Sequence, residues 1–152
     1  YRAHLVQRAA SHRRDAIEYL PIVPPWELPA VIARHDVGLA LEAVSPRSRD
    51  LTITNKMLQY LNAGLPIIAT RTAGQSEVLS RAPDAGVGID LEETAAVAAQ
   101  LDSLLTNRER LSSMARAARV AAETIYCWER EAPRLQAAVD AALHRATPAM
   151  TL

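Results

Sequence analysis

A lysine at the predicted start of a helix is the feature of this chain best suited to chemistry. Residues 54–63 carry apolar side chains at the spacing of a helix with one buried face: Met57, Leu58 and Leu61. Gly64 follows, where a helix end favours a residue that adopts positive φ. Lys56 lies in the first turn of this helix, where a cation is unfavourable unless an anion is nearby. The sequence therefore indicates a phosphate ligand next to Lys56.

The segment after Gly64 supports the same interpretation. Residues 65–69 are apolar, which is typical of a strand that is covered on both faces. Pro66 can lie only at the beginning of such a strand, because its missing N–H does no harm there. In an open α/β sheet, a helix N-terminus near the carboxyl ends of the strands is a place where anions bind. The helix start around Thr54 is therefore expected at a ligand-binding edge.

Strands and helices alternate along the chain, which predicts a doubly wound, parallel, Rossmann-like α/β sheet. We expect four strands, at residues 16–20, 36–41, 65–69 and 86–90. We expect helices at residues 4–12, 26–34, 54–63, 75–81, 92–105, 108–125 and 132–144, the last with Pro133 in its first turn. Residues 42–53 are predicted to be a loop and residues 71–74 a turn. Four strands are few for such a sheet, and the first residue is not Met, so we expect a domain truncated at its N-terminus.

Composition excludes several classes of function. The net charge of 0 gives no electrostatic case for binding nucleic acid. No apolar run approaches the ~20 residues of a membrane span, and the N-terminus lacks the layout of a signal peptide. The single cysteine, Cys127, cannot form an internal disulfide and fits a reducing compartment. The histidines show no metal-binding spacing, so no metal site is expected.

Two catalytic motifs are excluded as well. Gly74-Gln75-Ser76 is similar to a nucleophile elbow, but Val78 replaces the required second glycine and no strand runs into Ser76. The chain contains no Gly-x-x-x-x-Gly-Lys run, which excludes a P-loop enzyme.

Four stretches carry a resemblance to a known family. They are a strand at residues 36–41, a helix–glycine–proline–strand signature at 55–69, a glycine followed by Glu-Val at 73–78, and Cys-Trp-Glu at 127–129. In this order, over roughly residues 15–143, the chain resembles the C-terminal, donor-binding half of a GT-B fold retaining glycosyltransferase of the glycosyl transferases group 1 family. The second stretch is specific, and the other three are weak alone.

The resemblance implies that a nucleoside-diphosphate sugar, UDP- or GDP-linked, binds at this edge. Thr54 and Asn55 would face the diphosphate with the backbone N–H groups of the helix start, and Lys56 would supply a cation. Gln59 occupies the position at which much of the family has an acid that holds the ribose hydroxyls. Gly74 and Glu77 would complete the donor site.

The resemblance also implies chemistry without a metal or cofactor. Transfer by this fold is described as metal-free, with cations and a helix end stabilising the leaving diphosphate. Arg47, Arg49 and Arg71 flank the expected cleft and are candidates for this task, but no catalytic residue is assigned.

The sequence departs from the family pattern in two places. An amide at Gln59 makes a weaker contact with hydroxyls than a carboxylate would. The position of a second acid, near the sugar, is Leu51 here, and the neighbouring Asp50 is more typical of a loop or capping residue. Lys56 and Gln59 are also compatible with ordinary surface residues, Glu77 with charge compensation at its own helix start, and Gly74 with turn geometry.

We therefore expect a partial Rossmann-like, nucleotide-sugar-binding domain at residues 1–125 and a C-terminal helix and tail at 126–152. The expected function is donor binding in a hexosyltransferase of polysaccharide biosynthesis, cytoplasmic or peripheral at the inner face of the membrane. Without the N-terminal acceptor-binding domain, the chain alone is expected to be inactive. The alternatives are a non-catalytic nucleotide- or protein-binding module and a purely structural segment. A truncated sheet would also be able to form a homodimer through its unpaired edge.

Overall fold

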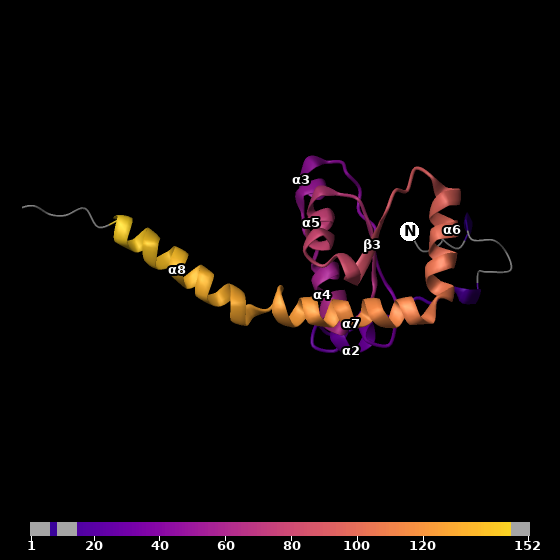
Figure 1. Cartoon of the computed structure of the whole chain (residues 1–152), viewed down its shortest axis with the longest axis horizontal. Coiled ribbons are helices and arrows are strands. Elements are labelled where there is room, and N and C mark those ends of the chain that lie inside the picture. The colour runs from indigo at the N-terminus through magenta and orange to yellow at the C-terminus, as the bar shows by residue number, and fades with distance from the viewer. Residues whose placement is uncertain (1–6, 9–14, 147–152) are drawn as a thin grey trace, which may run out of the picture.

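The computed structural model describes residues 7–8 and 15–146 of the chain, and its elements are labelled in Figure 1. The helices and strands are, in order, α2 (Leu28–Ile32), β1 (Gly38–Ala40), α3 (Arg47–Leu51), α4 (Asn55–Ala63), β2 (Ile67–Thr70), α5 (Ala73–Arg81), the 3-10 helix η2 (Pro83–Ala85), β3 (Gly86–Ile89), α6 (Thr94–Thr106), α7 (Arg108–Thr124) and α8 (Trp128–Ala146).

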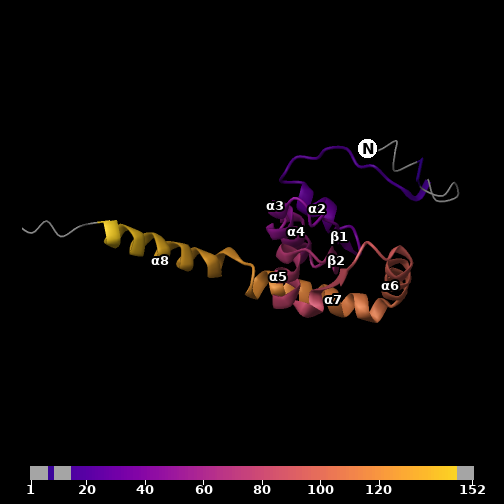
Figure 2. The ribbon, with the colours of Figure 1, turned by 90° about the horizontal axis from the view of Figure 1, so that it is seen from above.

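The described strands form one parallel sheet in the order β1-β2-β3. Gly38 of β1 pairs with Ile67 of β2, which pairs in turn with Gly86 of β3. Helices lie on both faces of the sheet: α4 and α5 on one and α6 on the other (Figures 1 and 2). The predicted doubly wound α/β class is therefore confirmed. Because the strands are parallel, all three end at the same edge of the sheet.

One face of the sheet is packed against α4, α5 and α7. Its core contains Ile67 and Ala69 of β2, Met57 and Leu61 of α4, and three alanines of α7: Ala118, Ala121 and Ala122. Met57, Leu61 and Ile67 are fully buried. Met57 and Leu61 thus anchor the helix, which fixes where its N-terminus points, whereas Leu58, predicted on the same buried face, is exposed.

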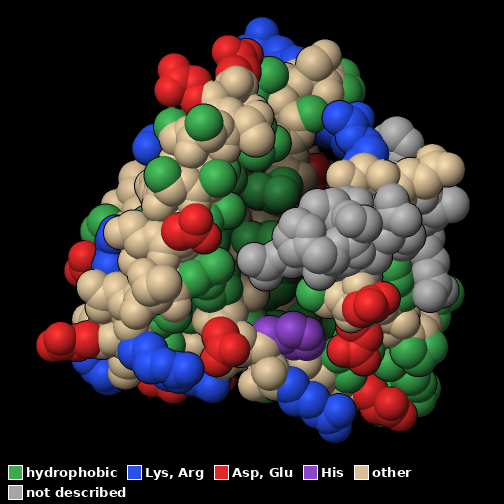
Figure 3. Space-filling view, turned by 90° about the vertical axis from the view of Figure 1, so that its right-hand side faces the viewer, with side chains coloured by type: hydrophobic (Ala, Val, Ile, Leu, Met, Phe, Trp, Pro, Cys, Tyr) green, Lys and Arg blue, Asp and Glu red, His purple; other side chains and the backbone are tan. Residues whose placement is uncertain are grey.

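The other face of the sheet is covered by α6. Ile68 of β2 and Ile89 of β3 pack here with Leu104 of α6 and Met114 of α7. Side chains alternate between the two faces along β2, as the pleat of a strand requires. The cover is incomplete, because Leu39 of β1, which pairs with Ile68, is 51% exposed. Hydrophobic side chains are visible in a hollow on this side of the molecule (Figure 3).

The helix start identified from the sequence lies where it was predicted. Helix α4 spans Asn55–Ala63, and Gly64 ends it in the left-handed conformation with φ of 69°. The N–H groups of Gly64 and Leu65 then bond to the carbonyls of Leu61 and Tyr60. This closure is the glycine C-cap expected from the sequence.

The strand predicted at residues 16–20 was wrong. Asp15 and Ala16 form a short 3-10 turn, and residues 17–24 have no regular secondary structure. A strand requires a hydrogen-bonded neighbour, and none of the three described strands pairs with this segment. Of the helix predicted at residues 4–12, only Gln7 and Arg8 are described, and both are helical.

One helix was missed, and several helix boundaries also differ from prediction. The expected loop at residues 42–53 contains α3, and the expected turn at 71–74 contains the start of α5, which Thr72 caps by accepting the N–H of Gln75. The last helix begins at Trp128 rather than near residue 132, with Pro133 inside it. Pro133 has no N–H to donate to the carbonyl of Glu129, so α8 lacks one helix hydrogen bond there.

Helix α8 extends away from the rest of the molecule (Figures 1 and 2). The stripe predicted for this helix does not join the core: Leu135 is 54% and Val139 49% exposed. The described core is therefore complete at the end of α7.

Candidate functional site

The carboxyl ends of the three strands form a cavity of about 340 Å³. Its lining comes from the segments that follow each strand: Glu42, Ala43 and Val44 after β1, Thr70 and Arg71 at the end of β2, and Ile89, Asp90, Leu91 and Glu92 after β3. This edge is where open α/β sheets bind ligands. Three carboxylates and one guanidinium line the cavity. Its net charge is therefore negative unless further cations lie beside it.

Lys56 supplies a cation next to this edge. Its Nζ donates to Oε1 of Glu42 at 2.6 Å, and the two side chains are 50% and 16% exposed, respectively. Lys56 is also the only lysine in the sequence, since Arg supplies every other permanent cation. A lysine acts as a compact, mobile point charge with three donors, whereas arginine presents a planar fork.

A buried threonine fixes the segment that carries Glu42. The hydroxyl of Thr70 accepts the backbone N–H of Glu42 at 2.8 Å and lies 2.8 Å from the Glu42 carbonyl. The same hydroxyl lies 2.9 Å from Oε1 of Gln75, whose side chain is fully buried. A hydroxyl has a single proton, so it donates to one of these two oxygens at a time. The end of β1 is thereby tied to β2 and α5.

The N-terminus of α4 retains unused hydrogen-bonding groups. Thr54 is its N-cap residue, but the Thr54 side chain makes no capping hydrogen bond, and its buried Oγ1 has no protein partner. The first free N–H groups of the helix, at Asn55 and Lys56, belong to exposed residues. Lys56 and Gln59 are three positions apart on this helix and both are exposed. Asn55, Lys56 and Gln59 are thus exposed on the first turns of α4, and Thr54 before them is half-buried.

The N-terminus of α5 is closed by protein. Oδ1 of Asp50 accepts the backbone N–H of Ala73 at 2.9 Å. Gly74 is buried in the first turn of α5, and a Cβ at this position would overlap the carbonyl of Thr52. Gly74 therefore allows α5 to approach the segment between α3 and α4. Asp50 has the capping role that the sequence favoured for it.

Glu77 lies away from α4. Its Oε1 pairs with Arg81 at 2.6 Å, one turn along α5. Both side chains act on Tyr126: burial raises the pKa of Tyr126, Arg81 opposes this rise and Glu77 adds to it. Glu77 thus already has a charged partner on its own helix. Four of the six predicted site residues thus lie at the N-cap and first turns of α4, and Gly74 and Glu77 lie on α5.

The sequence did not point to Glu42, Thr70 or Gln75 as site residues. Glu42 and Thr70 follow or end predicted strands, and a polar residue at that position in a parallel sheet is a signal for the ligand-binding edge. Gln75 gives no such signal, because its role depends on burial beneath Thr70.

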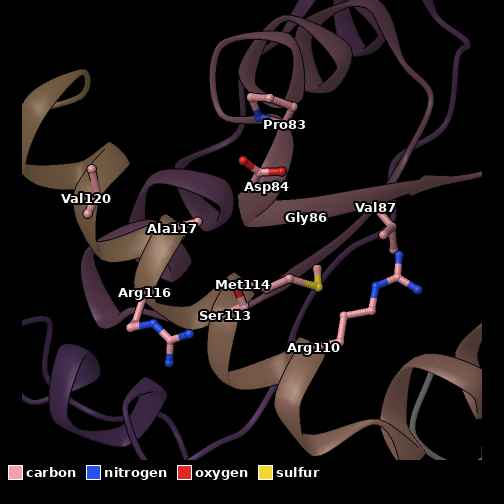
Figure 4. Close-up of a pocket in the computed structure, with 10 residues that line it drawn as sticks. All are labelled: Pro83, Asp84, Gly86, Val87, Arg110, Ser113, Met114, Arg116, Ala117 and Val120. Carbon is pink, nitrogen blue, oxygen red and sulfur yellow. The ribbon is translucent and has the colours of Figure 1, made fainter.

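A larger cavity, of about 430 Å³, lies elsewhere (Figure 4). It is formed by η2, the first residues of β3 and α7, with Arg110, Arg116 and Asp84 at its wall. The cavity lies at the amino end of β3, opposite the edge at which parallel sheets bind ligands. Its charged side chains are exposed, and Arg116 already bonds to Oγ of Ser112 at 2.8 Å. We therefore place the candidate site at the carboxyl edge.

Other kinds of site find no support in the described residues. Within them, no three His, Cys, Asp or Glu side chains are grouped so that they could hold a metal ion. Among these residues, no helix combines the length and the apolar character needed to cross a membrane.

The chain was then compared with known proteins. A family model described as glycosyl transferase-like matches residues 3–137. Spore coat protein SA of Bacillus subtilis (strain 168) is 24% identical over 123 residues, an alignment that covers 81% of this chain and 31% of that protein. The chain thus spans less than a third of the length of this relative. No solved structure matches the chain with significance. The family match confirms the resemblance predicted from the sequence.

Proposed function

The chain belongs to the glycosyl transferase-like family, and from this we propose that it is the donor-binding domain of a retaining GT-B glycosyltransferase. The proposed donor is a UDP- or GDP-linked hexose, bound at the carboxyl edge of the sheet. The observation that carries the proposal is the position of Lys56, the only lysine, at the open N-terminus of α4 beside the 340 Å³ cavity.

In this proposal the diphosphate lies against the start of α4. The backbone N–H groups at Asn55 and Lys56 donate to phosphate oxygens, the helix dipole adds partial positive charge, and Lys56 adds a full one. Gln59, one turn further along the same exposed surface, accepts a ribose hydroxyl. Arg71 lines the cavity and is the second cation available to the leaving diphosphate.

Gly74 and Glu77 have supporting roles in the proposal. Gly74 keeps α5 close to the segment that leads into α4, and Glu77 contacts the donor only if the sugar extends along α5. The acceptor is bound by a second domain, so the chain alone carries out no transfer. The proposed setting is polysaccharide biosynthesis in the cytoplasm or at the inner face of a membrane.

A second candidate is a non-catalytic nucleotide- or protein-binding module. The ion pair between Lys56 and Glu42, together with Leu51 and Gln59 at positions where acids are common in the family, favours it. Both candidates predict ligand binding at the same edge, and they differ in whether transfer occurs.

Calorimetric titration with UDP-, GDP- and ADP-sugars tests the proposal. One of the first two is expected to bind, and Lys56→Ala is expected to weaken binding about 10-fold to 150-fold, because a charge-assisted contact to phosphate is worth roughly 1.5–3 kcal/mol. Arg134→Ala is the matched control, since this cation lies on α8, pairs with Glu131 and should leave binding unchanged. No binding by any donor, or binding that is insensitive to Lys56→Ala, contradicts the proposed site.

A transfer assay separates the two candidates. Adding the N-terminal part of a family member is expected to allow donor hydrolysis or transfer, whereas the chain alone gives none. Turnover by the chain alone would show that the acceptor domain is not required.

A further inference from the structure

The contact of Glu42 with Lys56 conflicts with the proposed ligand. A carboxylate and a diphosphate both seek the same ammonium group, and Glu42 already holds it at 2.6 Å. Lys56 has further donors, but binding both anions would bring two negative charges close together at a partly buried site. The side chain of Glu42 is only 16% exposed, so water screens this repulsion incompletely.

The backbone of Glu42 is poorly placed to relieve the conflict by moving. Its N–H is bonded to the Thr70 hydroxyl, which is 6% exposed and also contacts the fully buried Gln75. Moving this backbone would break hydrogen bonds that water does not replace readily. The Glu42 side chain is free to rotate without this cost, because Lys56 is its only recorded partner in the described part of the chain.

We propose that Glu42 is a built-in competitor for the donor diphosphate. In the unliganded protein its carboxylate holds Lys56, and the diphosphate displaces that carboxylate while the Glu42 backbone stays clamped by Thr70. This inference rests on the proposed donor site and adds a residue that sets its affinity. Glu42 neutralises the cation when no donor is present, and it lowers the affinity of the site for the diphosphate.

Glu42→Gln tests the competition, because it removes the charge but keeps the size and the hydrogen-bonding capacity of the side chain. We expect UDP or GDP to bind about 1.5-fold to fivefold more tightly to this variant, the range of a partly exposed ion pair. Glu92→Gln is the matched control: it removes a carboxylate from the same cavity, but its side chain does not contact Lys56. We expect this control to change binding less than Glu42→Gln does.

A separate measurement detects the ion pair between Lys56 and Glu42 in the absence of nucleotide. Because Lys56 is the only lysine, reductive methylation with ¹³C-formaldehyde labels one side chain besides the N-terminal amine. Lys56→Arg identifies its NMR signal by deleting it. We expect Glu42→Gln to shift this signal in the free protein and UDP or GDP to shift it in the wild type.

The two measurements separate the possible failures. Unchanged or weaker nucleotide binding by Glu42→Gln overturns the competition, as does an equal gain in Glu92→Gln. An unmoved Lys56 signal in Glu42→Gln shows that the ion pair itself is absent in solution. If neither nucleotide binds wild type or variant while that signal does shift, the proposed donor site is wrong and the ion pair is structural.

Discussion

The carboxylate of Asp50 accepts the backbone N–H of Ala73 at 2.9 Å, which ties α3 to the first turn of α5. We expect Asp50→Ala to lower the free energy of unfolding by about 1–2 kcal/mol, because it leaves a helix N–H without its charged acceptor. Urea denaturation measures the loss. Glu123→Ala, an exposed acid on α7, is the control and should change stability by less than about 0.5 kcal/mol. Equal stability of Asp50→Ala and wild type would contradict the capping role.

The close approach of α5 to Thr52 depends on Gly74. We expect Gly74→Ala to destabilise the protein by about 1–3 kcal/mol, because the added Cβ would overlap the Thr52 carbonyl and force a backbone shift. Ser76→Ala is the control on the same helix, since Ser76 is exposed and alanine favours helix. A melting temperature of Gly74→Ala at or above that of the wild type would show that α5 and the segment around Thr52 move apart at little cost.

The core and the C-terminal helix should respond differently to the same substitution. Leu61 is fully buried under the sheet, so Leu61→Ala is expected to cost about 2–5 kcal/mol. Leu135 on α8 is 54% exposed, and Leu135→Ala should cost less than about 0.5 kcal/mol. Chemical denaturation of both variants measures the difference. A large loss from Leu135→Ala would mean that α8 packs against something in solution.

Stability is expected to fall at alkaline pH in a way that depends on Tyr60. Burial raises the pKa of Tyr60 above its usual value of 10.0, and the nearby Lys56 opposes that rise. The folded state therefore keeps the proton after the unfolded chain has lost it. The stabilisation is fully present below pH 10 and is lost as pH rises through the pKa of the folded state.

Tyr60→Phe removes this titration and tests the effect. We expect the unfolding free energy of the variant to decline less steeply than that of the wild type above about pH 10. The variant also loses the hydrogen bond from the Tyr60 hydroxyl to the Leu39 carbonyl, at 3.2 Å. This loss should lower the unfolding free energy by the same amount at every pH below about 10. If the unfolding free energies of the two proteins fall equally steeply above pH 10, the Tyr60 hydroxyl is solvated in the folded state.

Local patterns in the sequence predicted the fold where helix periodicity and a terminating glycine agreed. Met57, Leu61 and Gly64 fixed both the extent of α4 and its buried face. The start of α5 was placed too late, because Gly74 resembles a turn residue until its packing against Thr52 is known. The segment at residues 16–20 has the composition of a strand, but composition does not supply a pairing partner.

The candidate site was predictable only in part, for a similar reason. Lys56 is identified by its conflict with the helix dipole, which is a local property. Its partner Glu42 is 14 residues away, and the Thr70 hydroxyl that holds Glu42 is 28 residues from it. Contacts of this kind arise when parallel strands end at one edge, and no spacing along the chain encodes them.

The position of α7 has a consequence for synthesis on the ribosome. The alanines at 118, 121 and 122 close one face of a sheet whose last strand ends at Ile89. A nascent chain whose three described strands have left the ribosome therefore still lacks α7, the helix that covers Met57 and Ile67. We expect stable folding only after α7 has left the exit tunnel, and ribosome-bound chains stalled earlier should remain sensitive to protease.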